Sequence, residues 1–281
     1  MRHVSGAVMG VALSIAAAAA AAPAQAAPLL SMPYSIGAFS QALQFMGDGS
    51  VRVACDGSVL VACDGSVRVI ENASFRTLGD GSVREVTPMV LLGDGSVRVG
   101  SAADLSGQDG MALTSLTFSP NPLLTGSVFV LDAGSPTTFL FTFAGPISLG
   151  GTAFTYELAG SATLTDPTGG SVSLTAQPLL GLSTPGIIAG GVDGSPGVAT
   201  IGSNLTGNGT TVLTPASGNG TCVACALQIL AFGLQGSGDG DKYSVTGTFD
   251  ITDPTVVVPA PAPLGLLASG LVLLGLVRRR G

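Results

Sequence analysis

The chain has 281 residues and a formal net charge of −7, and setting aside its two apolar ends leaves a body with six basic and 17 acidic residues. A body of net charge −11 lacks the basic surface that nucleic acid requires, which excludes nucleic acid as a partner. The one histidine, His3, lies in the apolar start, so the body lacks the residue most often used for acid–base catalysis and metal binding. We therefore predict a protein that is not an enzyme and holds no cofactor.

The first 26 residues are typical of a secretory signal peptide. A short basic start is followed by an apolar, alanine-rich stretch over 4–22 and then by a small-x-small cleavage pattern. Pro23 interrupts a helix at the point where a peptidase needs extended chain. The alternatives are an uncleaved N-terminal anchor and a buried core helix. The predicted cleavage signal comprises Ala24, Ala26 and Ala27, with the cut after Ala26.

A lead-in over 27–46 precedes a repeat over 47–100, in which Asp-Gly-Ser-Val occurs five times. Asp-Gly between β-prone runs is typical of a hairpin turn, and the initial spacing of eight predicts six-residue strands joined by two-residue turns. In that register Cys55 pairs with Ser58, and Cys63 falls on the opposite face from Cys55. A solenoid would instead stack the two cysteines. The irregular later spacing also fits a duplicated insertion without function, poorly ordered in the folded protein.

Residues 101–255 are predicted to form an antiparallel β-sandwich, which makes the fold all-β. Phe139, Phe141 and Phe143 share one face of a strand, and residues 243–251 alternate between apolar and polar side chains. Residues 225–234 are the stretch most similar to a helix, but their β-branched and aromatic residues favour a buried strand. Clusters of turn residues separate these strands at 133–136, 166–170, 192–197 and 236–241.

Cys222 and Cys225 form a CxxC motif. A zinc site needs a second pair at matching spacing, which Cys55 and Cys63 do not offer, and a redox pair needs a βαβ context. In an exported chain we expect a structural disulfide, either between Cys222 and Cys225 or from each of them to Cys55 and Cys63.

Asp239 and Asp241 lie in a glycine-rich turn and are the calcium candidates of the body, because Ca²⁺ prefers carboxylate oxygens. A plain β-turn before the strand at Tyr243 explains the same residues, since Asp-Gly is ordinary turn chemistry. We therefore predict no metal site.

Residues 256–281 contain a proline-rich motif, an apolar run and a basic end. The apolar run over 264–277 has 14 residues and as a helix spans about 21 Å, which is short of the bilayer core of about 30 Å. The basic end is expected to stay on the cytoplasmic side and stop transfer. The motif comprises Val258, Pro259, Ala260, Pro261, Ala262 and Pro263, and the basic end comprises Arg278, Arg279 and Arg280.

This three-part tail resembles the PEP-CTERM sorting signal, nearest its VPxPA-type variants, with Ala260 where the type motif has Glu. The resemblance covers only the tail. It implies export across the inner membrane of a Gram-negative bacterium, transient anchoring in that membrane and processing by an exosortase. It also implies association with exopolysaccharide or biofilm. A plain C-terminal anchor is the alternative.

These observations predict an exported, non-enzymatic protein of the cell surface or extracellular matrix. Serine- and threonine-rich faces of its strands suit contact with polysaccharide. The alternative is a calcium-assisted adhesin or glycan-binding module that uses Asp239 and Asp241. A hydrolase or lyase built on carboxylates is a third hypothesis, which the absence of histidine from the body disfavours.

Overall fold

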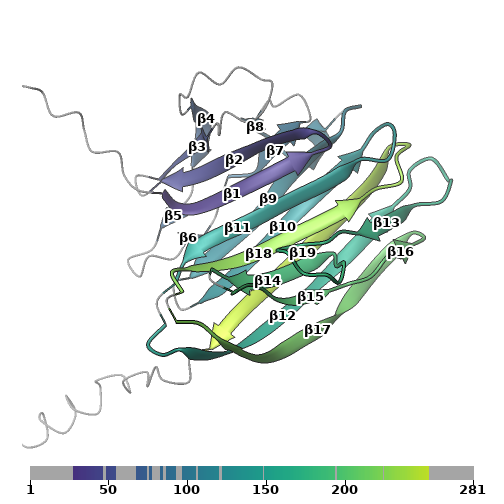
Figure 1. Cartoon of the computed structure of the whole chain (residues 1–281). Coiled ribbons are helices and arrows are strands. Elements are labelled where there is room, and N and C mark those ends of the chain that lie inside the picture. Colours follow the sequence, from purple (N-terminus) through teal and green to yellow (C-terminus); the bar gives the residue numbers. More distant parts are fainter. Residues whose placement is uncertain are drawn as a thin grey trace, which may run out of the picture.

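The computed structural model describes residues 28–46, 49–54, 68–74, 76–77, 83–84, 87–92, 97–105, 107–119, 122–147, 149–193, 195–223 and 225–252. These residues form an all-β protein in which two antiparallel sheets lie face to face (Figure 1). The helical structure among them is one 3-10 turn, η1 (Ala102–Asp104). Within these ranges no helix is long and apolar enough to cross a membrane.

One sheet has ten strands, and eight of them follow the order β15-β14-β18-β11-β1-β2-β3-β4. β13 pairs with β18 beside this path, and β16 pairs with β13. Every pairing in the sheet is antiparallel. The strands are β1 (Pro28–Ile36), β2 (Phe39–Met46), β3 (Ser50–Ala54), β4 (Arg68–Ser74), β11 (Thr138–Pro146), β13 (Ser173–Ala176), β14 (Ile188–Val192), β15 (Ser195–Ile201), β16 (Leu205–Thr206) and β18 (Leu227–Gln235).

The other sheet has nine strands, seven of them in the order β17-β12-β19-β10-β9-β6-β5. β7 pairs with both β9 and β8. The strands are β5 (Arg76–Thr77), β6 (Val83–Arg84), β7 (Met89–Leu92), β8 (Val97–Val99), β9 (Gly110–Ser119), β10 (Leu123–Asp132), β12 (Ala153–Thr165), β17 (Gly209–Thr221) and β19 (Asp241–Thr252).

The core lies between the two sheets and takes alternate side chains from each. Phe139, Phe141 and Phe143 of β11 are all buried, which confirms the predicted shared face. The ring of Phe141 stacks on that of Phe232 in β18 at 4.8 Å between centroids. β19 alternates buried and more exposed residues along its length, as predicted. Residues 227–235 form strand β18 and not a helix.

Three glycines form a row across the inner face of the nine-stranded sheet. Gly247 of β19 pairs with Gly126 of β10 on one side and with Gly160 of β12 on the other. A Cβ at Gly126 would lie 2.5 Å from Phe143, and a Cβ at Gly247 would lie 2.9 Å from Phe232. The row therefore leaves the space that the aromatic rings of the opposite sheet fill.

The sandwich begins earlier than the predicted boundary at residue 101. β1 lies between β11 and β2 in the ten-stranded sheet, and Met32 and Phe45 belong to the main core. Residues 28–46 of the predicted lead-in therefore form two strands of the sandwich. The reason is physical: strand β11 is central, and β1 satisfies the backbone hydrogen bonds on one of its edges.

The repeat adopts a different register from the predicted meander. A two-residue turn that pairs Cys55 with Ser58 would place Val53 opposite Leu60, but Val53 lies opposite Arg68. The partner of Val53 is thus eight residues, or one repeat unit, further along the chain than predicted. β3 pairs with β4, which follows the third Asp-Gly-Ser-Val at 64–67. Nearly identical units offer nearly identical strands, so local sequence does not specify which unit pairs. Cys55 and Cys63 lie outside the described residues.

Candidate functional site

The outer face of the nine-stranded sheet is covered with hydroxyl groups. Side chains on adjacent strands bond to each other, with Oγ1–Oγ1 distances of 3.1 Å for Thr125–Thr248 and 2.8 Å for Thr163–Thr210. We call this surface the hydroxyl face. It comprises Ser115, Thr117, Thr125, Ser127, Ser161, Thr163, Thr210, Ser244, Thr246 and Thr248.

Strand parity explains the hydroxyl face. Each of β10, β12 and β19 places apolar residues inward, and the residues between them point outward. The strand register then aligns Thr117, Thr125 and Thr248 in one row across three strands. The result is an extended array of groups that both donate and accept hydrogen bonds.

Apolar residues on the outer sides of the two sheets are covered elsewhere. Leu131 of β10 packs under Leu105, beside η1, in a small separate cluster. On the outer side of the ten-stranded sheet, Leu179 covers Ala189 and Ala231. The exception is Val212 of β17, which lies opposite Ser161 at the border of the hydroxyl face and is 78% exposed.

Two carboxylates lie together at one end of the hydroxyl face. Glu157 of β12 is directly opposite Asp250 of β19, and both side chains are exposed. They line a hollow of about 330 Å³ together with Ser217 and Asn219 of β17. Lys242 is exposed near the other end of β19. The face between these two ends is uncharged.

A second acidic pair, which sequence reasoning missed, lies inside the sandwich. Asp132 of β10 is opposite Asp241 of β19, and their exposed fractions are 0% and 3%. Asp132 Oδ2 accepts hydrogen bonds from the amides of Gly238 (2.9 Å) and Thr137 (3.3 Å). Burial raises the pKa of Asp132 from 3.8 to about 6, and the nearby charges of Asp109 and Asp241 add to this. The sequence does contain a signal for the burial of Asp132. Side chains alternate along a strand, and Asp132 is two residues from Val130, which faces inward.

Tyr243 completes the buried polar network. Its hydroxyl donates to the carbonyl of Ser173 at 2.9 Å and accepts the amide of Ser237 at 2.8 Å. Burial raises the pKa of Tyr243, and the charges of Asp241 and Asp132 raise it further. The network ties the loop 236–240 to β13 and to the end of β10.

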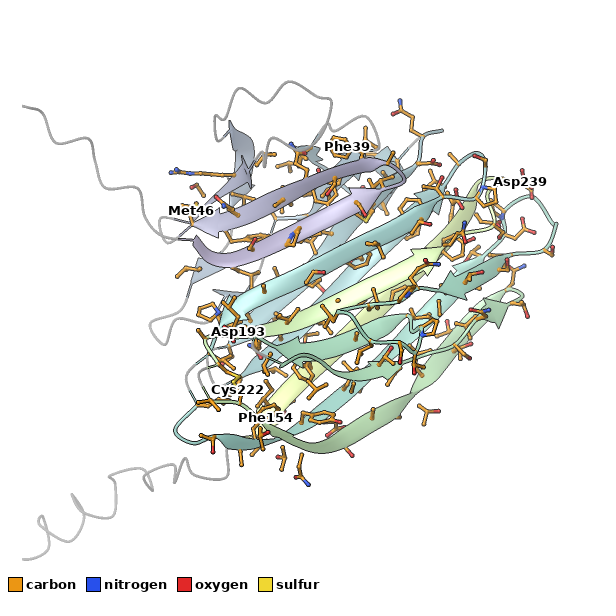
Figure 2. All side chains as sticks on the ribbon, in the orientation of Figure 1. Phe39, Met46, Phe154, Asp193, Cys222 and Asp239 are labelled. Carbon is orange, nitrogen blue, oxygen red and sulfur yellow. A yellow bond between two sulfur atoms is a disulfide. The ribbon has the colours of Figure 1, made fainter. Side chains whose placement is uncertain are left out.

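The structure does not bring the two calcium candidates together. Asp239 is exposed in a turn at φ 59°, whereas the side chain of Asp241 is buried and accepts a hydrogen bond from Ser237 Oγ. Figure 2 shows Asp239 at the rim of the sandwich, at the end opposite Cys222. The part of the chain that the structure describes contains no group of three or more His, Cys, Asp or Glu residues able to hold a metal ion.

A disulfide joins Cys222 and Cys225 in the connection between β17 and β18, with 5.8 Å between their Cα atoms. Asp193 lies beside it, in the β14–β15 turn (Figure 2). The carboxylate of Asp193 accepts the amides of Ala226 at 2.7 Å and Leu227 at 2.8 Å. The disulfide and this carboxylate together hold the start of β18, which is a structural role.

The predicted export and sorting residues lie outside the described residues, so the structure neither places them nor tests their roles. They are Ala24, Ala26, Ala27, Val258, Pro259, Ala260, Pro261, Ala262, Pro263, Arg278, Arg279 and Arg280.

No protein-family model matches the chain, and no curated protein matches it.

Proposed function

We propose that the chain is an exported, non-enzymatic protein of the cell surface or extracellular matrix that binds exopolysaccharide through its hydroxyl face. The observation that carries the proposal is the uncharged array of Ser and Thr side chains across β9, β10, β19, β12 and β17. Polysaccharides present many hydroxyl groups, and each finds a donor or an acceptor on such a surface.

The hydroxyl face suits a long polymer better than a small sugar. Neighbouring strands are about 4.8 Å apart and the sheet is extended, so an adsorbed chain can make many weak contacts at once. The chain has no tryptophan to supply a strong stacking contact. Cross-strand bonds such as Ser127–Thr246, at 2.9 Å between hydroxyl oxygens, already order the side chains before binding.

Charge selects the kind of polysaccharide. On strands β9, β10, β12, β17 and β19, the exposed charged residues are the Glu157–Asp250 pair at one end of the hydroxyl face and Lys242 near the other. The body as a whole is acidic, with a net charge of −11. An anionic polymer is repelled by this field, so the proposed partner is a neutral or amine-bearing polysaccharide.

The termini supply the proposed route to this location. The signal peptide directs export, and the PEP-CTERM-like tail holds the chain in the inner membrane until an exosortase acts at Val258–Pro263. Intact-mass measurement of the protein from membrane, periplasm and medium tests this route. Cleavage after Ala26 and loss of the segment from 264 to 281 are the expected results, and a released protein that keeps both ends would contradict it.

Binding to insoluble polysaccharide tests the hydroxyl face directly. We expect the double variant Thr125→Val and Thr248→Val to lose at least about tenfold in affinity, because two ordered hydroxyls are replaced by methyl groups. The matched control is Thr142→Val, which changes an outward-facing threonine of β11 on the other sheet. Equal binding by the double variant and the control would refute the proposed surface.

A further inference from the structure

The buried acidic pair lies where two loops meet. Asp132 ends β10 and is followed by the loop 133–137, while Asp241 begins β19 and follows the loop 236–240. Side chains directly opposite on antiparallel strands have Cβ atoms about 4.5–5.5 Å apart. Both side chains point into the sandwich, so two carboxyl groups share one poorly hydrated space.

Asp132 holds both loops through one oxygen. Its Oδ2 accepts the amide of Thr137 from the first loop and the amide of Gly238 from the second. The loops also bond to each other directly, because the Asp239 amide donates to the carbonyl of Gly134 at 2.9 Å. Any change at Asp132 therefore acts on both loops.

The other oxygen of Asp132 favours a proton. Oδ1 is buried and has no hydrogen-bond partner among the described residues. A buried carboxylate oxygen without a donor is unfavourable, whereas a protonated carboxyl group carries less charge to desolvate. The two amide bonds to Oδ2 favour the carboxylate, but burial of the group and of the facing Asp241 outweighs them, so the neutral acid is favoured.

The groups around Asp132 add negative charge. Asp241 faces it from β19, and Asp109 lies beside it, accepting bonds at 2.8 Å from the Ala133 amide and from Thr137 Oγ1. Tyr243 is the other titratable group of this network. Lys242 pairs with Leu131 on the outer face and is exposed, so it does not point toward the pair.

We infer that Asp132 and Asp241 form a proton-controlled latch, which holds the loops 133–137 and 236–240 closed when Asp132 is protonated and loosens when it ionises. The inference is independent of the polysaccharide proposal, because the pair lies inside the sandwich and the hydroxyl face lies outside.

The direction of the pH dependence follows from the raised pKa of Asp132, which is about 6 in the folded protein against 3.8 as the ordinary value. Below about pH 4 the closed and the open forms both carry the proton. As the pH rises from about 4 to about 6, the open form releases the proton first and is favoured. The latch is therefore tightest in acid and weakest at neutral pH.

Amide hydrogen exchange of the full chain measures the latch locally. The protection factors of the Thr137 and Gly238 amides, corrected for intrinsic exchange, should fall by on the order of a hundredfold between pH 4 and pH 7. The carboxyl carbon of Asp132 should titrate with a midpoint near 6 in the same samples. Constant protection, or a midpoint below about 4.5, overturns the inference.

Two variants separate the latch from a general effect of acid. Asp132→Asn should abolish the pH dependence of the Gly238 amide, while Asp250→Asn, in the exposed pair of the same strand, should leave it unchanged. Asp241→Asn keeps the carboxyl of Asp132 but removes the facing charge, so the midpoint of Asp132 should move down. If Asp132→Asn does not fold, the wild-type titration and the Asp241→Asn midpoint decide. If the midpoint of Asp132 is unchanged in Asp241→Asn, the two residues do not act as a pair.

Discussion

The two faces of the nine-stranded sheet share one backbone but differ in chemistry. On β19, Val245 and Phe249 are buried against the ten-stranded sheet, while Thr246 and Thr248 point outward and bond to hydroxyls of β10. Side-chain direction alternates along a strand, so adjacent residues belong to different environments. The inner face stabilises the fold, which leaves the outer face free for interaction.

Each face also has one pair of acidic residues that face each other. Asp132 and Asp241 are buried, whereas Glu157 and Asp250 are exposed. Water and salt screen the outer pair, so its repulsion is small. The inner pair has no such screening. Burial is the main reason that the pKa of Asp132 is raised.

The largest expected effect comes from removing an aromatic ring from the inner face. Phe249→Ala should lower the free energy of unfolding by about 3–5 kcal/mol, because it leaves a cavity against the opposite sheet. The neighbouring change Thr248→Ala, on the outer face, should cost less than about 1 kcal/mol. Urea unfolding measures both. Similar losses in the two variants would refute the division of roles between the faces.

Asp132→Asn should change stability in a pH-dependent way. Wild-type stability should decrease from about pH 4 to about pH 6, since the raised pKa makes the unfolded chain the stronger acid. The raised pKa of Asp132 corresponds to a loss of about 3 kcal/mol in the free energy of unfolding at neutral pH. The Asn variant should lack this decrease. Thermal unfolding over this pH range tests it. A parallel decrease in the variant would assign the effect to other groups.

Gly126→Ala tests the row of glycines. The added methyl group would lie 2.5 Å from Phe143, so the aromatic rings must shift and the free energy of unfolding should fall by about 1–3 kcal/mol. Thr125→Ala, one residue away on the outer face, is the control and should have the smaller effect. Calorimetry of both variants tests this prediction. A Gly126→Ala protein as stable as the wild type would show that the core has room for a methyl group beside Phe143.

The smallest expected effect belongs to the exposed acidic pair. Asp250→Asn removes the repulsion from Glu157 and should raise the free energy of unfolding by about 0.2–1 kcal/mol. Because the pair is exposed, the gain should shrink as salt is added. Urea titrations at low and high ionic strength test this. A gain that is independent of salt would mean that the pair is more shielded from solvent than its exposure indicates.

The alternation of side chains within single strands was predictable from the sequence. Phe139, Phe141 and Phe143 were expected on one face, and the strand over 243–251 was expected to be half buried, because period two is a local property. Turn clusters such as 236–241 were equally readable, since glycine and aspartate favour turn conformations wherever they occur. Gly247 interrupts the run of inward-facing apolar residues in this strand. The sequence does not explain it, because the ring of Phe232 that occupies the space belongs to the opposite sheet.

Which strands become neighbours was decided by the tertiary structure. β1 pairs with β11 more than a hundred residues later, and Val53 pairs with Arg68 although a nearer repeat unit offers the same Asp-Gly-Ser-Val turn. Asp132 and Asp241 are likewise 109 residues apart, so their pairing depends on the order of strands in the sheet. The burial that raises the pKa of Asp132 depends on how the two sheets pack. Local sequence directs each side chain up or down, but long-range hydrogen bonding and core packing select its partner.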